Sequence, residues 1–244
     1  MFRTLLAIAF AVVYLIVGIP VLFVEWIIAK KNPYLRDISC LRMVQWALRV
    51  IYKICGVKLT VIGQENIPKD EPVLYVANHS SYFDIIITYS LCPKLTGYVA
   101  KDSLEKVPLL NRWMKRLYCL FMNRDDLKAS LNTIKQGIEY IKQGISICIF
   151  PEGTRGDGKT LLPFKEGSLK MAERTGCAII PMAISNTAAI LKDHMPFAKP
   201  AKVIVEYAEP IYPKTLSKEE RRALGAYTQN VIQGILDRNQ AACE

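Results

Sequence analysis

The start of the chain holds the feature that most restricts its fold, an uncharged run of 21 residues from Thr4 to Val24. At about 1.5 Å per helical residue, such a run can cross a hydrocarbon layer of roughly 30 Å. It is longer than the apolar part of a typical signal peptide, and no small-x-small cleavage site precedes Lys30. We therefore expect a membrane-associated helix. Gly18 and Pro20 lie inside the run, so a kinked hairpin that enters one leaflet without spanning is the alternative.

Basic residues are concentrated after this run. Seven Lys or Arg residues lie between Lys30 and Lys58, against Arg3 alone on the other side, which predicts that the body of the protein is cytoplasmic. The whole chain has 32 basic and 22 acidic residues, a net charge of +10. This balance indicates an anionic partner such as phospholipid headgroups or a phosphorylated substrate. Nucleic acid is disfavoured, because the sequence has no basic block interleaved with aromatics and no zinc-finger or RNA-binding pattern.

The next segment, Ile38 to Cys55, has the pattern of an amphipathic helix. One predicted face is a basic stripe made of Arg42, Gln45, Arg49 and Lys53. The opposite face is apolar and consists of Leu41, Val44, Leu48, Ile51 and Ile54. We interpret this segment as a helix at the membrane interface, with a helix packed on the domain core as the alternative.

From Val57 onward, strand-like and helical segments alternate, which predicts an α/β fold with a mostly parallel central sheet flanked by helices. The clearest helix is predicted from Leu127 to Gln143, and a final helix from Lys218 to Arg238 begins with the capping box Ser217-x-x-Glu220. The predicted strands are Lys58–Ile62, Val73–Ala77, Gly97–Ala100, Cys119–Met122, Ile145–Phe150, Ile179–Ile184 and Val203–Tyr207.

The stretch from Asn78 to Asp84 follows one of these strands and contains one of only two histidines in the chain. His79 can take a proton near neutral pH, and a carboxylate on its other ring nitrogen would fix its tautomer. Five residues turn a continuous helix so far that His79 and Asp84 could not share a face. A turn must therefore separate them, and Ser81-x-x-Asp84 has the form of a capping box that begins a helix after it. The alternative is a loop histidine beside an ordinary helix cap.

A second polar stretch, Phe150 to Thr160, is rich in glycine and also follows a predicted strand. Its residues Gly153-x-x-x-x-Gly158-Lys159-Thr160 match the phosphate-loop pattern of nucleotide-binding enzymes. A true phosphate loop opens directly into a helix, whereas Pro163 would disrupt a helix here. We prefer an anion site of another kind, in which the glycine turn offers backbone N–H groups and Arg155 a two-pronged charged donor. A surface turn with a local pair between Glu152 and Arg155 is the alternative.

The seven cysteines are scattered singly within apolar segments and form no C-x-x-C pair. They indicate small buried side chains in a reducing compartment, and the ligand residues available suggest no metal requirement. The other histidine, His194, lies among charged residues and proline and is interpreted as a surface residue.

The histidine stretch and the glycine-rich stretch, Phe150-Pro-Glu-Gly-Thr-Arg155, together resemble the first and third motifs of the glycerolipid acyltransferase family, specifically its 1-acyl-sn-glycerol-3-phosphate acyltransferases. The resemblance covers about residues 57 to 215. Tyr118 stands where the family usually has glycine, and Ala178 where proline is frequent. Further blocks in the family's order are Val99-Ala-Lys101, Phe121-Met-Asn-Arg124, Leu161-Leu-Pro-Phe-Lys165 and Cys177-Ala-Ile-Ile-Pro181-Met182.

This resemblance implies transfer of an acyl chain from acyl-CoA or acyl-carrier protein to the sn-2 hydroxyl of lysophosphatidic acid, forming phosphatidic acid without any cofactor or metal. His79 would act as general base and Asp84 would hold its other nitrogen. A covalent intermediate on Ser80 or Ser81 is disfavoured, because a thioester is already activated. The implied substrate-binding residues are Lys101, Arg124, Glu152, Gly153, Thr154 and Arg155.

We expect three parts: a membrane-associated helical motif (1–56), the catalytic domain (57–215) and a C-terminal helix packed on it (216–244). The compact length suggests a bacterial enzyme at the inner membrane, with its catalytic domain on the cytoplasmic face and the bilayer as a partner. Three alternatives remain: an acyltransferase for another lysolipid acceptor such as an ornithine-lipid precursor, a phosphate-loop nucleotide-binding enzyme, and a catalytically inactive lipid-binding protein of the same fold.

Overall fold

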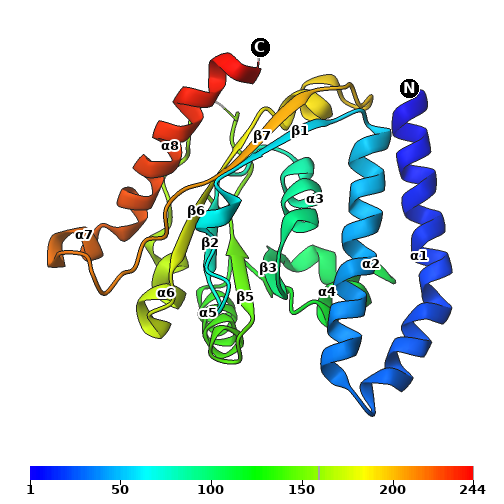
Figure 1. Cartoon of the computed structure of the whole chain (residues 1–244), viewed down its shortest axis with the longest axis horizontal. Coiled ribbons are helices and arrows are strands. Elements are labelled where there is room, and N and C mark those ends of the chain that lie inside the picture. The colour runs from blue at the N-terminus through cyan, green and yellow to red at the C-terminus, as the bar shows by residue number, and fades with distance from the viewer. Residues whose placement is uncertain (159, 244) are drawn as a thin grey trace.

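A single sheet forms the centre of the molecule (Figure 1). Within residues 1–158 and 160–243, which the computed structural model describes, it has seven strands in the order β1-β7-β6-β2-β5-β3-β4. Neighbouring strands are parallel except for the antiparallel pair β6 and β7. The predicted α/β fold with a mostly parallel sheet is therefore confirmed. The strands are β1 (Lys58–Ile62), β2 (Leu74–Ala77), β3 (Thr96–Lys101), β4 (Leu120–Met122), β5 (Ser146–Ile149), β6 (Ile179–Ser185) and β7 (Lys202–Tyr207).

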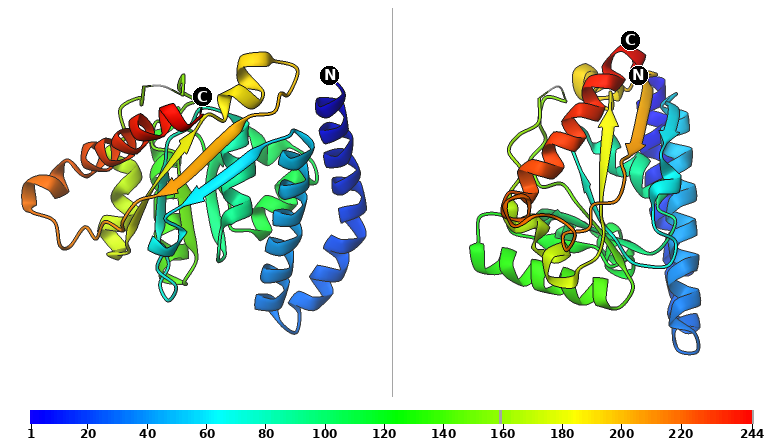
Figure 2. Two further views of the ribbon diagram at one scale, coloured as in Figure 1. Left: turned by 45° about the horizontal axis from the view of Figure 1, so that its top comes forward. Right: turned by 60° about the vertical axis from the view of Figure 1, so that its left-hand side comes forward.

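Helices cover both faces of this sheet, so its central strands are apolar throughout instead of alternating. In β2, Tyr75 and Ala77 join one buried cluster, whereas Leu74 and Val76 join another on the opposite face. Figures 1 and 2 show α1 to α4 on one side of the sheet and α5, α6 and α8 on the other. The helices are α1 (Phe2–Ala29), α2 (Pro33–Ile54), α3 (Tyr82–Leu91), α4 (Leu110–Arg116), α5 (Leu127–Lys142), α6 (Lys170–Thr175), α7 (Lys218–Arg222) and α8 (Leu224–Cys243).

The first two helices form a hairpin beside the sheet (Figure 1). Of the described helices, α1 is the one long and apolar enough to cross a membrane, and most of its apolar side chains are exposed. The start of α1 contacts both the end of α2 and the body of the protein. The Arg3 guanidinium donates to the carbonyl of Ile54 at 3.0 Å, and the Ala198 amide donates to the Thr4 hydroxyl at 2.7 Å. The start of α1 thus lies against the end of α2 and the segment that leads into β7.

The predicted basic stripe on α2 is wrong at one position. Gln45 is buried, and its amide donates to the carbonyls of Tyr89 and Cys92 at 3.3 and 2.7 Å near the end of α3. They lie at the carboxyl end of α3, where backbone carbonyls lack a full set of helical partners, so a buried amide side chain finds acceptors there. The exposed stripe instead consists of Arg42, Trp46, Arg49 and Lys53.

The C-terminal helix is divided, although the sequence predicts one continuous helix. Its capping box is confirmed, since Ser217 and Glu220 each bond the other's backbone amide at the start of α7. The helix breaks at Ala223, and the Gly225 amide then donates to the carboxylate of Glu166 at 3.0 Å. A side chain distant in sequence thus provides the acceptor for a backbone amide in the first turn of α8. This helix then packs along β6 and β7.

Candidate active site

Four neighbouring parallel strands, β2, β5, β3 and β4, end at the same edge of the sheet. A predicted site residue lies at the end of each strand or within three residues after it. His79 follows β2, Glu152 follows β5, Lys101 ends β3 and Arg124 follows β4. The carboxyl ends of parallel strands are the usual place for ligand sites in α/β proteins. The sheet therefore gathers residues that are far apart in the sequence.

His79 and Asp84 form a hydrogen-bonded pair across the predicted turn. The Nδ1 atom of His79 lies 2.7 Å from Oδ2 of Asp84. Ser81 caps α3, and the Asp84 carboxylate accepts from the backbone amides of Ser80 and Ser81, each at 2.7 Å. The capping box and the histidine partner are thus the same carboxylate, so the two interpretations of Asp84 were not exclusive.

The tautomer of His79 follows from this contact. An ionised carboxylate only accepts hydrogen bonds, so Nδ1 carries the proton and Nε2 keeps a free electron pair. Asp84 is completely buried, whereas the His79 side chain is 11% exposed and lines a cleft. The ring of Phe150 stacks on the imidazole, with their centroids 4.4 Å apart. Packing and hydrogen bonding together hold His79 in an orientation suited to a general base.

Glu152 joins the glycine-rich stretch to the histidine stretch. Its two carboxylate oxygens accept from the backbone amides of His79 at 2.7 Å and Leu162 at 3.0 Å. The Gly156 amide in turn donates to the His79 carbonyl at 2.8 Å. Burial raises the pKa of Glu152 above its ordinary value of 4.5, against the opposing effect of the two amides. The observed contacts make Glu152 a support for the His79 backbone, and its predicted contact with substrate stays a prediction.

A cleft of about 430 Å³ opens beside His79. Three cationic side chains line it, those of Lys101, Arg124 and Arg155. The Arg155 guanidinium lies 4.0 Å above the ring centroid of Tyr82. Burial lowers the pKa of Arg124, whose guanidinium donates to the carbonyl of Gly153. Thr154 and Gly153 also line the cleft, so of the predicted substrate-binding residues only Glu152 is absent from its described lining.

The phosphate-loop interpretation does not fit the backbone here. Gly153 and Gly158 both have positive φ angles, of 73° and 83°, as a tight glycine turn requires. The chain from Leu161 to Lys165 is irregular, and a short 3-10 helix, Glu166–Leu169, comes next. A phosphate loop would pass directly into an α-helix. Lys159, its predicted phosphate ligand, lies outside the described residues.

Thr187 is a further polar residue at this edge of the sheet, and no motif in the sequence predicts its role. It follows β6, which is parallel to β2, so it reaches the same sheet edge. Its buried hydroxyl donates to Oδ1 of Asp84. A polar residue just after an apolar strand was the available signal. Asn78, by contrast, bonds the backbone of Ile184 through both ends of its amide and fixes the end of β2 to β6.

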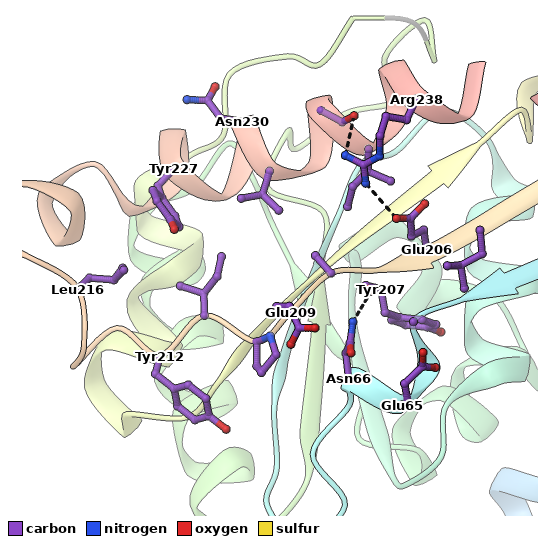
Figure 3. Close-up of a pocket in the computed structure, with 18 of the residues that line it drawn as sticks. Glu65, Asn66, Glu206, Tyr207, Glu209, Tyr212, Leu216, Tyr227, Asn230 and Arg238 are labelled. Atoms are coloured by element: carbon purple, nitrogen blue, oxygen red, sulfur yellow. Dashed lines mark hydrogen bonds and ion pairs between the residues drawn. The ribbon is translucent and has the colours of Figure 1, made fainter. Parts of the chain in front are cut away.

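A larger hollow, of about 840 Å³, lies between α8 and the segments that follow β1 and β7 (Figure 3). Because β7 is antiparallel to β6, this hollow is at the opposite edge of the sheet from His79. Its labelled polar residues include Glu206, which pairs with Arg238 at 3.1 Å. None of the predicted site residues is among its described lining residues, so size does not identify the site here.

The cysteines and His194, which were not predicted to bind a ligand, are not among the described lining residues of the cleft. Among the described side chains, the six cysteines are unpaired, and five of them are buried. Cys243 lies at the end of α8, and its side chain is outside the described part of the structure. His194 is half-buried in a short 3-10 turn, Lys192–His194. The described residues contain no group of three or more His, Cys, Asp or Glu side chains arranged to hold a metal ion.

Comparison with known proteins agrees with this geometry. Residues 58–185 match the sequence model of the acyltransferase family. The 1-acyl-sn-glycerol-3-phosphate acyltransferase of Borreliella burgdorferi is 31% identical over 192 residues, which are 78% of this chain and 76% of that protein. The enzyme of the same name from Saccharomyces cerevisiae is 29% identical, and the match covers 80% of this chain but only 66% of the yeast protein.

A solved structure of an acyltransferase resembles this chain over nearly its whole length. The crystal structure of the 1-acyl-sn-glycerophosphate (LPA) acyltransferase from Thermotoga maritima superimposes with a TM-score of 0.86 and is 28% identical. The superposition covers 98% of this chain and 95% of the Thermotoga protein, and it therefore includes the N-terminal hairpin. The resemblance inferred from the motifs is confirmed, and the chain belongs to the acyltransferase family.

Proposed function

We propose that this enzyme transfers an acyl chain from an acyl thioester to the sn-2 hydroxyl of 1-acyl-sn-glycerol-3-phosphate and so forms phosphatidic acid. The observation that carries the proposal is the His79–Asp84 pair, with its 2.7 Å contact, at a cleft lined by three cationic side chains. The names of the relatives from Borreliella and yeast support the same reaction.

In the proposed reaction, Nε2 of His79 takes the proton of the acceptor hydroxyl as its oxygen attacks the thioester carbonyl. The carbon–sulfur bond then breaks. The sulfur takes the proton from His79 and leaves as a thiol. Asp84 stabilises the intermediate imidazolium without taking its proton. Ser80 and Ser81 are not needed as nucleophiles. The Ser81 hydroxyl already accepts from the Phe83 amide at 3.3 Å, and the Ser80 hydroxyl lies 2.9 Å from that of Thr187.

The cations of the cleft are proposed to hold the acceptor phosphate. Arg155 and Arg124 provide charge-assisted, two-pronged donors, and Lys101 adds a point charge. Partial desolvation of Arg124 strengthens its electrostatic contacts within the cleft. Gly153 and Thr154 form the wall beside these residues. A phosphomonoester carrying about two negative charges fits this set better than a zwitterionic headgroup.

We further propose that the hairpin of α1 and α2 inserts into one leaflet of the cytoplasmic face of a membrane. The exposed apolar face of α1 supports insertion. Because Thr4 at the start of α1 contacts Ala198 in the body of the protein, a helix that crossed the bilayer would have to break that contact. Insertion from one side keeps it. The site then meets its lipid acceptor at the surface where the acceptor resides.

The test is acyl transfer by the purified protein from labelled acyl-CoA and, in parallel, labelled acyl-carrier protein. The acceptors are lysophosphatidic acid, lysophosphatidylcholine and an acyl-ornithine precursor. We expect phosphatidic acid from the first acceptor and at least one donor, with little product from the other two. Product from acyl-ornithine alone would move the proposal to another lysolipid acceptor, and no product from any pair would reject acyl transfer to lysolipids.

A further inference from the structure

A chain of buried hydroxyl groups lies behind the His79–Asp84 pair. Thr187 is completely buried, and its hydroxyl donates to Oδ1 of Asp84. The same hydroxyl lies 2.9 Å from the hydroxyl of Ser80, which is also buried. Asn186, just before Thr187, has a φ of 68°, a left-handed conformation that Asn adopts more readily than most residues. This turn brings the threonine under the carboxylate.

The direction of these hydrogen bonds is determined by the number of protons. A hydroxyl has one proton to donate, and an ionised carboxylate can only accept. The Thr187 proton therefore points to Asp84, so Thr187 accepts the proton of Ser80. The other carboxylate oxygen, Oδ2, accepts from His79 Nδ1 and from the amides of Ser80 and Ser81. Oδ1, the Asp84 oxygen that faces away from the histidine, thus accepts a hydrogen bond from the Thr187 side chain.

We propose that Thr187 is a positioning residue for acyl transfer, with Ser80 orienting its hydroxyl, and this inference rests on the proposed function of His79 as base. With Oδ1 held, the carboxylate cannot rotate Oδ2 away from Nδ1. The donated proton also stabilises the carboxylate charge in a site without water contact. Thr187 acts through Asp84 and does not touch substrate.

The activity test compares Thr187→Val, which keeps the shape of the side chain but loses its hydroxyl, with Thr187→Ser, which keeps the hydroxyl. We expect kcat to fall by about ten- to a hundredfold in Thr187→Val, as is typical when an outer hydrogen-bond partner is removed, with KM little changed. Thr187→Ser should keep most of the wild-type rate. Equal rates in Thr187→Val and wild type, with His79→Ala inactive, would overturn the inference and leave the proposed function standing.

The pH profile of kcat distinguishes positioning from simple packing. Without the Thr187 proton, negative charge concentrates on Oδ2 and favours the imidazolium form of His79. The acidic limb of the profile should therefore move to higher pH in Thr187→Val and stay in place in Thr187→Ser. If the acidic limb lies at the same pH in all three proteins, Thr187 only fills space, and the inference is overturned.

A spectroscopic measurement tests the inference without activity. In a His194→Gln background His79 is the only histidine, so its Nδ1–H proton resonance is identified without ambiguity. We expect this resonance to change its chemical shift or broaden in Thr187→Val and to stay in place in Thr187→Ser. An unchanged resonance in Thr187→Val would overturn the positioning role even if the wild type transferred no acyl group. Absence of transfer would by itself count only against the proposed function.

Discussion

At the scale of single residues, Glu152 is subject to two opposing effects. Burial disfavours its charge, whereas the amides of His79 and Leu162 favour it. Burial is the larger effect, so the folded protein holds a proton on Glu152 at pH values where the unfolded chain has released it. The stability contributed by this group is therefore greatest below its ordinary pKa of 4.5 and is lost as the pH rises through the folded-state value.

This balance predicts how Glu152→Gln changes stability with pH. The difference in free energy of unfolding between wild type and variant should decrease as the pH rises above the ordinary pKa of 4.5, measured by urea titration in detergent. Glu139→Gln, on an exposed carboxylate paired with Lys142, is the control and should show little trend. A difference that grows with pH would mean that the amide hydrogen bonds outweigh burial.

At the scale of the elements, α1 gives the clearest prediction. Ile8, Val12 and Ile16 are each at least 50% exposed and lie one turn apart on one face. Burying such a side chain contributes about 1.5–3 kcal/mol. Replacing all three with Glu should lower binding to lipid vesicles by at least about a hundredfold, measured by flotation. Leu127→Glu with Leu131→Glu, on exposed positions of α5, should leave binding unchanged. Equal loss in both variants would count against α1 as the inserting helix.

The elements also explain what the sequence could predict. Every strand was predicted to within one residue at each end, because the central strands are short apolar runs and the edge strand β1 alternates between exposed and half-buried residues. The inward position of Gln45 and the break at Ala223 depend on partners that are distant in sequence, the end of α3 and the Glu166 carboxylate. The His79–Asp84 pair could be predicted because its residues are adjacent in one motif. The contact of Thr187 with Asp84 could not be predicted, because only the pairing of β6 with β2 brings the two residues together.

At the scale of the whole molecule, the net charge of +10 and the apolar hairpin act together. Attraction between basic residues and anionic lipid is screened by salt, whereas insertion of apolar side chains is not. Binding should therefore be tighter to vesicles containing anionic phospholipid than to neutral vesicles. This preference should shrink between about 0.05 M and about 0.5 M NaCl, while binding to neutral vesicles stays constant. A preference that salt does not reduce would point to a specific lipid site instead of surface charge.

The central claim is that His79 is the base for acyl transfer. It is tested most directly by the rate of phosphatidic acid formation in wild type, His79→Ala and His194→Ala, using the donor that the wild type accepts. The chain contains only these two histidines, so each variant is a control for the other. We expect His79→Ala to lose about a thousandfold or more in kcat and His194→Ala to retain the wild-type rate. A His79→Ala protein that keeps the wild-type rate would contradict the mechanism.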